Sequence, residues 1–502
     1  MSSSSVIRYI DNEGKRHRQG HLMSLLPTTK IREGERVLDE TRLFYDLSAF
    51  LAYKHFQDRS SQVLQDLSER LASCHFQWTF LGIMTQFSPI EAVRGLTTYL
   101  DRVRASKTAN ATNSTLTNTD DLAVLSPKTT RTSASQTTEL PLQKPFALLG
   151  AARSQASHSL SVLAGTMELP QISSSSTSAV LDDAPFFART IHPSEHMSKV
   201  LMVYLKSLGV THAGLLFFRR SYQKNLDFYA KQFDIYLHHF VYNELDDFDE
   251  RVQELKDSQM WYFIGALKPG YWQSAVRNLY WQGLMGKKTE DSIHYQWFFT
   301  GMLDLVSEGF VLDAREDWDL AHALHGAGVV GQKVTPNADF DNALASIKDD
   351  KAFQQEFIKS HSEPHLFDNI TFDTPGWSKI QFLTYDAVIA LGITACETPG
   401  LFTGIKFYDN LLKIDFEGVS CRVQLDSKTG NRREEGVEFE IINVAISDQT
   451  SAHQDNGSIS FTQNATALIT FQPETHQGNV ELLQPFLYND NTTKPPTHVA
   501  QL

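Results

Sequence analysis

The sequence is poor in cysteine and in basic residues, and it has no long apolar run. Its three cysteines, Cys74, Cys396 and Cys421, are too few for a disulfide scaffold and lack the CxxC spacing of zinc sites. Lys and Arg number 45 against 59 Asp and Glu, so the formal net charge is −14. This balance argues against nucleic acid and against anionic membrane surfaces as partners, because both require a basic patch.

No segment approaches the roughly 18 uncharged apolar residues of a transmembrane helix. Residues 1–20 lack the apolar core of a signal peptide, and we expect them to be disordered. Taken alone, these features favour a cytoplasmic protein. Six Asn-x-Ser/Thr sequons instead favour glycosylation and a cell-surface, extracellular location; they lie at Asn110, Asn113, Asn369, Asn456, Asn464 and Asn491. A shortened reading frame or a clipped ectodomain would reconcile the two observations.

The chain has 502 residues, of which 41% are hydrophobic, enough for a sizeable core and about two to four domains. Between residues 146 and 300, short apolar segments alternate with amphipathic ones of helical period. This alternation predicts βαβ units and an α/β fold with doubly wound parallel sheets. Residues 105–140, rich in Ser, Thr and Asn, are predicted to form a disordered insert, and residues 447–502 a polar C-terminal extension.

Two motifs imitate cofactor and metal sites. Residues 326–331 match the G-x-G-x-x-G pattern of dinucleotide-binding proteins, but the preceding segment is predicted to be helical rather than a strand. A flexible glycine loop is the better interpretation, and we expect no cofactor. His192 and His196 have the spacing of a zinc pair, but no third ligand is evident, so a helix start without metal is favoured.

A run of serines follows a predicted strand at residues 170–172. Ser173 to Ser176, Thr177 and Ser178 form this run. In an open α/β sheet, ligands bind beyond the carboxyl ends of the strands. Hydroxyl groups and free backbone amides at such a place suit a carboxylate or an α-amino acid. A Ser-rich surface loop is the alternative.

The stretch from Phe146 to Ser194 resembles the receptor family ligand-binding region, which has the type I periplasmic-binding-protein fold. That domain serves class C G-protein-coupled receptors, natriuretic-peptide receptors, ionotropic glutamate receptors and bacterial amino-acid-binding proteins. The matching positions are Gly150, Pro170, Gln171, Ile172, Ser173, Ser176, Thr177, Leu181, Asp183, Phe187, Arg189 and Thr190. The similarity continues at residues 385–391 and 416–420, so that it extends over about 146–446, with a looser match over 40–104. The chain departs from the family at residues 151–153, where Pro and Ser are common, and at Gln223, which replaces a Gly.

The resemblance implies two lobes joined by a three-strand hinge, forming a Venus-flytrap domain over residues 21–446. Lobe 1 would hold about 21–190 and 365–420, and lobe 2 about 195–360 and 437–446. A ligand would bind in the cleft between the lobes and favour the closed state. Dimerisation through lobe 1, as a homodimer or a heterodimer, is common in the family.

Carried over by position, the resemblance also implies ligand-binding residues. Lobe 1 would supply Ser154 together with Ser175, Ser176 and Thr177, and lobe 2 would supply Tyr222, whose counterpart stacks on the ligand. Arg153 is specific to this chain, and a guanidinium at a helix start suits a carboxylate, with a solvent-facing charge as the alternative. In an oxidising compartment, Cys396 and Cys421 could form a disulfide, the alternative being two buried thiols.

Three functions are compatible with these features. The first is the non-enzymatic ligand-sensing domain of a cell-surface receptor that binds an amino-acid-like or small acidic ligand. Its membrane signalling part would lie outside this chain. The second is a soluble solute-binding protein of the transport type. The third, an α/β enzyme or nucleotide binder using Gly326–Gly331, is disfavoured because no nucleophile and base are found together.

Overall fold

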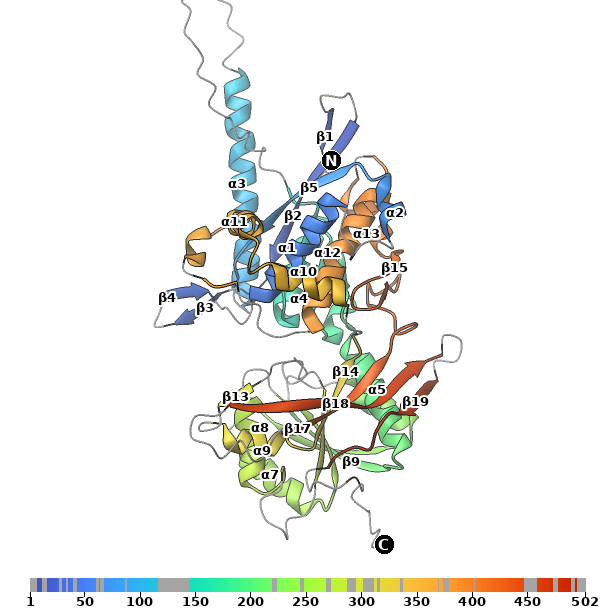
Figure 1. Cartoon of the computed structure of the whole chain (residues 1–502). Coiled ribbons are helices and arrows are strands. Elements are labelled where there is room, and N and C mark those ends of the chain that lie inside the picture. The colour runs from blue at the N-terminus through green and yellow to red at the C-terminus, as the bar shows by residue number, and fades with distance from the viewer. Residues whose placement is uncertain are drawn as a thin grey trace, which may run out of the picture.

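A computed structural model of the chain shows two α/β lobes joined by three crossing segments (Figure 1). It describes residues 7–10, 16–26, 29–32, 35–38, 43–59, 63, 67–85, 88–115, 144–218, 224–243, 248–267, 272–286, 295–300, 311–313, 317–334, 337–368, 370–372, 379–400, 402–446, 458–472, 477–488 and 493.

The lobe 1 sheet is a parallel sheet with one antiparallel addition. Its parallel strands lie in the spatial order β5, β2, β6, β7, β8, and β1 pairs antiparallel with the first part of β2. The bounds are β1 Ile7–Ile10, β2 Arg16–Leu25, β5 Phe76–Gly82, β6 Ala147–Gly150, β7 Gln171–Ser173 and β8 Phe187–Arg189. Since the chain order reverses between β2 and β6, a crevice is expected at the carboxyl ends of these two strands.

Helices cover this sheet and share its core. The apolar α12 lies against α1, and both belong to one buried cluster with Phe76, Trp78 and Phe146. The ring of Trp78 stacks on that of Phe146 at 5.3 Å between centroids. The lobe 1 helices are α1 Leu43–Asp58, α2 Ser68–Ala72, α3 Pro89–Thr115, α4 Ser154–Thr166, α10 Ala338–Ser346, α11 Lys351–Lys359, α12 Lys379–Glu397 and α13 Gly404–Leu411. Two small hairpins complete the lobe, β3 Thr29–Arg32 with β4 Glu35–Leu38 and β15 Asp415–Glu417 with β16 Arg422–Gln424.

The lobe 2 sheet repeats the same strand order and then extends it. Its parallel strands run β10, β9, β11, β12, β14, followed by the antiparallel strands β17 and β18. The bounds are β9 His212–Phe218, β10 Tyr236–Tyr242, β11 Tyr262–Ala266, β12 Gln296–Thr300, β13 Val311–Asp313, β14 Ala327–Gln332, β17 Phe439–Ile446, β18 Ser458–Phe471 and β19 Gly478–Leu482. The helices are α5 Ser194–Ser207, α6 Lys224–Gln232, α7 Phe248–Asp257, α8 Trp272–Trp281 and α9 Trp318–Leu324. The prediction of two doubly wound lobes is therefore confirmed.

The chain crosses between the lobes three times. Crossover 1, residues 190–193, joins β8 to α5; the second crossing lies between Gln332 and Ala338; crossover 3, residues 425–438, joins β16 to β17. An ion pair between Lys379 of α12 and Glu440 of β17 lies beside these crossings, and Lys379 also donates to the carbonyl oxygen of Gln332 at 3.0 Å.

Several predicted boundaries need correction. Residues 338–360, assigned to lobe 2, form α10 and α11, whose Phe340 and Phe357 belong to the lobe 1 core. The N-terminal 20 residues contribute β1 and the start of β2 rather than only disordered chain. The predicted insert at 105–140 begins inside α3, which continues to Thr115, and the rest of it lies outside the described residues. The C-terminal extension contains β18 and β19, which lengthen the lobe 2 sheet.

The glycine-rich segment 326–331 is neither a nucleotide-binding turn nor a flexible loop. Residues 327–332 form β14, a fully buried strand between β12 and β17. Gly328 lies against the ring of Phe298, so closely that an added Cβ would come within 2.3 Å of it. Gly214 and Gly265 accommodate the rings of Phe263 and Phe299 in the same way. These glycines therefore make room for phenylalanine rings from neighbouring strands.

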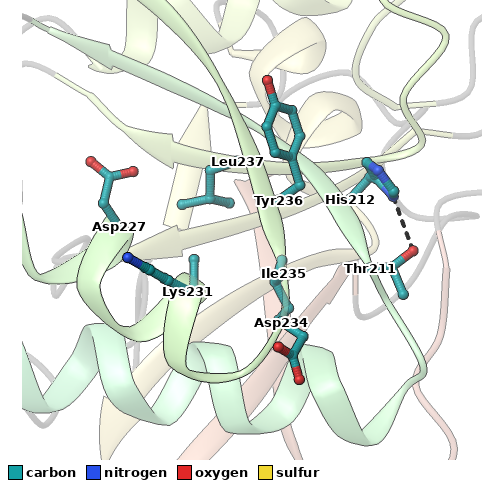
Figure 2. Close-up of a pocket in the computed structure, with 9 residues that line it drawn as sticks. Thr211, His212, Asp227, Lys231, Asp234, Ile235, Tyr236 and Leu237 are labelled. Atoms are coloured by element: carbon teal, nitrogen blue, oxygen red, sulfur yellow. Dashed lines mark hydrogen bonds between the residues drawn. The ribbon is translucent and has the colours of Figure 1, made fainter.

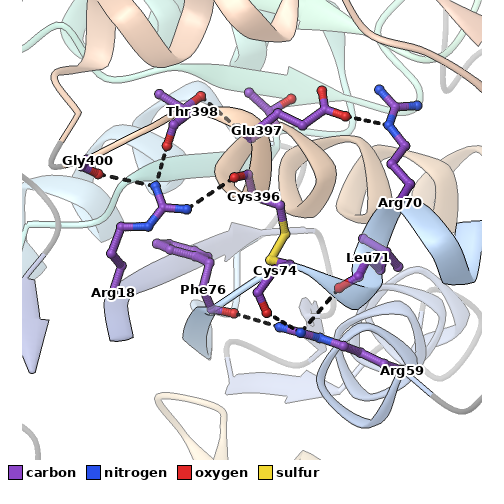
Figure 3. Close-up of a disulfide and its surroundings, with 11 residues drawn as sticks. Arg18, Arg59, Arg70, Leu71, Cys74, Phe76, Cys396, Glu397, Thr398 and Gly400 are labelled. Carbon is purple, nitrogen blue, oxygen red and sulfur yellow. Dashed lines mark hydrogen bonds and ion pairs between the residues drawn. A yellow bond between two sulfur atoms is a disulfide. The ribbon is translucent and has the colours of Figure 1, made fainter. Parts of the chain in front are cut away.

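The disulfide joins a different pair of cysteines from the predicted one. Cys74, just before β5, is bonded to Cys396 near the end of α12 (Figure 3), and their Cα atoms are 5.0 Å apart. Cys421 is free and partly buried. The guanidinium of Arg18 donates to the carbonyl oxygen of Cys396, and Arg59 donates to that of Leu71. The predicted pair, Cys396 and Cys421, was chosen because the two residues are close in sequence. In the structure, α12 places Cys396 beside Cys74, which is 322 residues away in the chain.

Among the described residues, α12 is the one helix long and apolar enough to cross a membrane. Within the fold, 89% of the apolar stretch of this helix is buried. Its composition therefore matches its position as the central helix of lobe 1.

Candidate functional site

Two segments come together at the carboxyl edge of the lobe 1 sheet. The amino end of α4 follows β6, and the serine loop, residues 173–178, begins at the end of β7. β7 and β8 are parallel, and the carboxyl end of β8 leads directly into crossover 1. Both segments and the start of crossover 1 therefore lie at the same edge of the sheet. A ligand that binds between the lobes is expected at this edge.

Hydroxyl groups of the serine loop are held by the turn after β6. The Oγ of Ser173 donates to the carbonyl oxygen of Ala151 at 2.9 Å, and that of Ser175 donates to the carbonyl oxygen of Ala152 at 2.9 Å. The amide of Ser176 donates to the Oγ of Ser173 at 3.2 Å. These bonds join the ends of β6 and β7 into one unit with a fixed shape.

Ser154 connects α4 to this unit. Its Oγ accepts a hydrogen bond from the amide of Ser178 at 3.1 Å. Arg153 is the N-cap residue of α4 and makes no side-chain cap, and its side chain is exposed. The first turn of a helix directs backbone amides outward and has a partial positive charge, so this edge suits an anionic group such as a carboxylate.

The structure brings together five of the six predicted ligand residues. Arg153, Ser154, Ser175 and Thr177 keep some exposure, whereas Ser176 is fully buried, with its Oγ 2.8 Å from that of Ser157. Ser176 thus supports the loop from beneath, and contact with a ligand remains a prediction for the other four. Tyr222 lies outside the described residues.

A surface pocket occurs elsewhere, on lobe 2 (Figure 2). It is lined by Asp227 and Lys231 of α6 and by residues at the starts of β9 and β10, including His212 and Tyr236. This pocket lies at the amino ends of the parallel strands, opposite the edge where this fold binds ligands. It is not the candidate cleft site.

The histidine pair resembling a zinc site lies at the start of lobe 2. The Nδ1 atoms of His192 and His196 are 2.9 Å apart, and His192 is fully buried against Phe439. Burial lowers the pKa of His196 to about 3, and burial also lowers the pKa of His192 well below its usual value. Both rings are neutral at neutral pH, one donating to the other. Across the described residues, no cluster of three or more metal-ligating side chains occurs.

This pair predicts acid sensitivity. Since the unfolded state binds protons near pH 6.5 and the folded pair does so only at lower pH, the free energy of unfolding falls as pH drops below about 6.5. Each histidine contributes a slope of up to about 1.4 kcal/mol per pH unit. Denaturant unfolding between pH 7.5 and 5 should show wild type losing stability relative to His196→Gln. His365→Gln, at an exposed position, should follow wild type; a His196→Gln variant that also parallels wild type would contradict the account.

Comparison with known proteins supports the predicted family and fold. The family described as "Receptor family ligand binding region" matches residues 104–232, a span that contains α4, the serine loop and β8. No curated protein sequence matches the chain. A solved structure titled as an ABC transporter substrate-binding protein from Desulfitobacterium hafniense, in complex with Leu, is similar with a TM-score of 0.53 and 13% identity. The match covers 88% of this chain and 100% of that one. The resemblance to the receptor family ligand-binding region and its type I periplasmic-binding-protein fold is thus confirmed.

Proposed function

We propose that this chain is the non-enzymatic ligand-sensing domain of a cell-surface receptor, closing around an amino-acid-like or small acidic ligand. The observation that carries the proposal is the joint position of the α4 amino end and the serine loop at the carboxyl edge of lobe 1, inside the segment that matches a receptor ligand-binding region. Backbone amides there suit a carboxylate. The hydroxyl of Ser175 is partly exposed and already donates to the carbonyl oxygen of Ala152, so its remaining lone pairs suit an ammonium donor.

Closure supplies the signal in this proposal. A ligand held between the lobes binds the closed state more tightly than the open state, and this difference shifts the population. The membrane part that reads the closure, such as a seven-helix or cyclase domain, lies outside this chain. Pairing of two copies, or of two related chains, through lobe 1 would carry the movement across a dimer.

A thermal-shift screen of the purified chain against amino acids, organic acids and nucleotides tests the proposal. An amino or organic acid at 100 times its Kd should add about 2.7 kcal/mol of stability. Ser175→Ala and Thr177→Ala should abolish the shift, whereas Thr462→Ala, at an exposed position on β18 of lobe 2, should keep it. A shift with nucleotides alone would contradict the proposal and favour a nucleotide binder.

A soluble solute-binding protein of the transport type is the second candidate, favoured by the fold shared with a substrate-binding protein. Both candidates predict binding of a small ligand. They differ in location, because the receptor candidate requires exposure outside the cell with its signalling part attached. Detection of the full-length gene product at the surface of intact cells by antibody would separate them.

Glycosylation gives a direct test of the extracellular location. Asn464 lies on β18 with an exposed side chain, and Asn110 and Asn113 lie on α3. The other sequons, at Asn369, Asn456 and Asn491, fall outside the described residues. Expressed through the secretory pathway, the chain should lose mass on treatment with an N-glycanase, and Asn464→Gln should lose one glycan. Cys421→Ser, which changes no sequon, should keep every glycan; an unglycosylated secreted chain would count against this location.

A further inference from the structure

The backbone of the serine loop is bonded directly to the first crossing between the lobes. The carbonyl oxygen of Ser173 accepts from the amide of Thr190 at 3.0 Å, and that of Thr177 accepts from the amide of Ser194 at 2.7 Å. The loop proposed to meet the ligand is therefore paired with crossover 1 and the first residue of α5.

Arg189 adds a second and stronger connection. Its side chain is fully buried, and Nη1 donates to the carbonyl oxygens of Ser176 at 3.1 Å and Ser178 at 2.9 Å. Nη2 donates to the carboxylate of Asp182, which forms an ion pair with Arg189. Burial lowers the pKa of Arg189 to about 10, while Asp182 opposes the shift, so the guanidinium stays charged at neutral pH.

The same guanidinium also holds crossover 3. Its Nε donates to the Oδ1 of Asn431 at 2.7 Å, and the Nδ2 of Asn431 donates to Asp182 at 3.0 Å. The amide of Arg189 donates to the carbonyl oxygen of Gly430 at 3.0 Å. Gly430 has a φ of +69°, and an added Cβ there would come within 2.2 Å of the carbonyl oxygen of Phe187. Crossover 3 therefore packs against β8 at Arg189, the residue that also bonds the serine loop.

We propose that Arg189 is a positioning residue that couples the serine loop to the hinge, so that occupancy of the loop changes the strands on which the lobes turn. Only an arginine fits this role, because its planar fork offers donors to the loop carbonyls, Asp182 and Asn431 at once, while the single ammonium of a lysine cannot span them. The ligand part of this inference rests on the proposed function, whereas the coupling of loop and hinge stands without any ligand.

Hydrogen exchange of the full chain tests the coupling without a ligand. Arg189→Lys and Asn431→Ala should each speed exchange of the Ser176 and Ser178 amides at least about 10-fold. In the double variant, the two increases in exchange rate should not multiply, because both substitutions act through the guanidinium of Arg189. Arg59→Lys is the matched control, because Arg59 is half-buried and also donates to backbone carbonyl oxygens, those of Leu71, Cys74 and Phe76 beside the disulfide. It should leave the amides of the serine loop protected. Rate increases that multiply in the double variant, or equally fast exchange of the serine loop in Arg59→Lys, would overturn the proposal. Asn431→Ala and its control decide the matter even if Arg189→Lys does not fold.

A second arm uses L-leucine and the other amino acids as probes. In wild type, a bound amino acid should slow exchange both in the serine loop and in residues 190–196; in Asn431→Ala it should slow the loop alone. Equal slowing of residues 190–196 in both proteins would overturn the coupling. Failure of every amino acid to slow the wild-type loop would instead count against the proposed ligand class, and the ligand-free arm would still decide the role of Arg189.

Discussion

Replacing Cys396 by serine should lower the free energy of unfolding of this chain by about 2–5 kcal/mol. The Cys74–Cys396 disulfide closes a loop of 322 residues, so removing it greatly enlarges the conformational freedom of the unfolded chain. It also separates β5 from the end of α12, two elements that share the lobe 1 core. Denaturant unfolding under oxidising conditions measures the loss.

The free thiol provides the control for this experiment. Cys421 is partly buried, and burial raises the pKa of its thiol, so it is a poor thiolate. Cys421→Ser should change stability by less than about 1 kcal/mol, and mass spectrometry of the non-reduced protein should find peptides of Cys74 and Cys396 joined. A Cys396–Cys421 crosslink, or equal losses in the two variants, would contradict the structure.

Replacing Asp386 by alanine should cost about 3–5 kcal/mol, because it leaves the buried amides of Val419 and Ser420 without an acceptor and removes a negative charge that attracts the buried Arg432. Asp386, on α12, is fully buried and accepts hydrogen bonds from the amides of Val419 at 2.8 Å and Ser420 at 3.0 Å. Burial raises its pKa to about 6, while Arg432 and the bonds from Ser420 oppose the shift. Arg432 donates to the Oγ of Ser420 at 2.9 Å, so Asp386, residues 419–420 and crossover 3 form one network.

An exposed carboxylate gives the matched comparison. Asp415 forms an ion pair with Arg422 at 2.7 Å, but both side chains are 41% exposed. Asp415→Ala should therefore cost less than about 1 kcal/mol. Unfolding curves of the two variants at pH 7.5 measure the difference. Equal losses of unfolding free energy in the two variants would show that Asp386 does not hold crossover 3 to α12.

The sequence predicted the architecture well because strand and helix periodicity is a local property. The alternation predicted between residues 146 and 300 is found in the structure, where β9 and β11 of lobe 2 are parallel strands separated by helices. The motif from Gly150 to Thr190 likewise located the serine loop, whereas β8 within it was not predicted as a strand. These features depend on neighbours in sequence, so a single chain is enough to reveal them.

What the sequence missed depends on partners distant in the chain. The pairing of Cys74 with Cys396 follows from the position of α12, and the burial of the 327–332 glycine strand follows from rings on β12. The return of residues 338–360 to lobe 1 is visible only from their contacts, because an amphipathic helix does not indicate which lobe it covers. The role of Arg189 was hidden for the same reason, since its partner Asn431 lies 242 residues away. Arg189 and Thr190 both match the family pattern, and this match was the one sign in the sequence that Arg189 has a specific role.

The most direct test of the central claim is to locate the binding of an amino acid by hydrogen exchange over the whole chain. The account predicts slowed exchange at residues 150–157 and 173–178, at the carboxyl edge of the lobe 1 sheet. Protection confined to residues 211–237, around the lobe 2 pocket, with the serine loop unchanged, would contradict it.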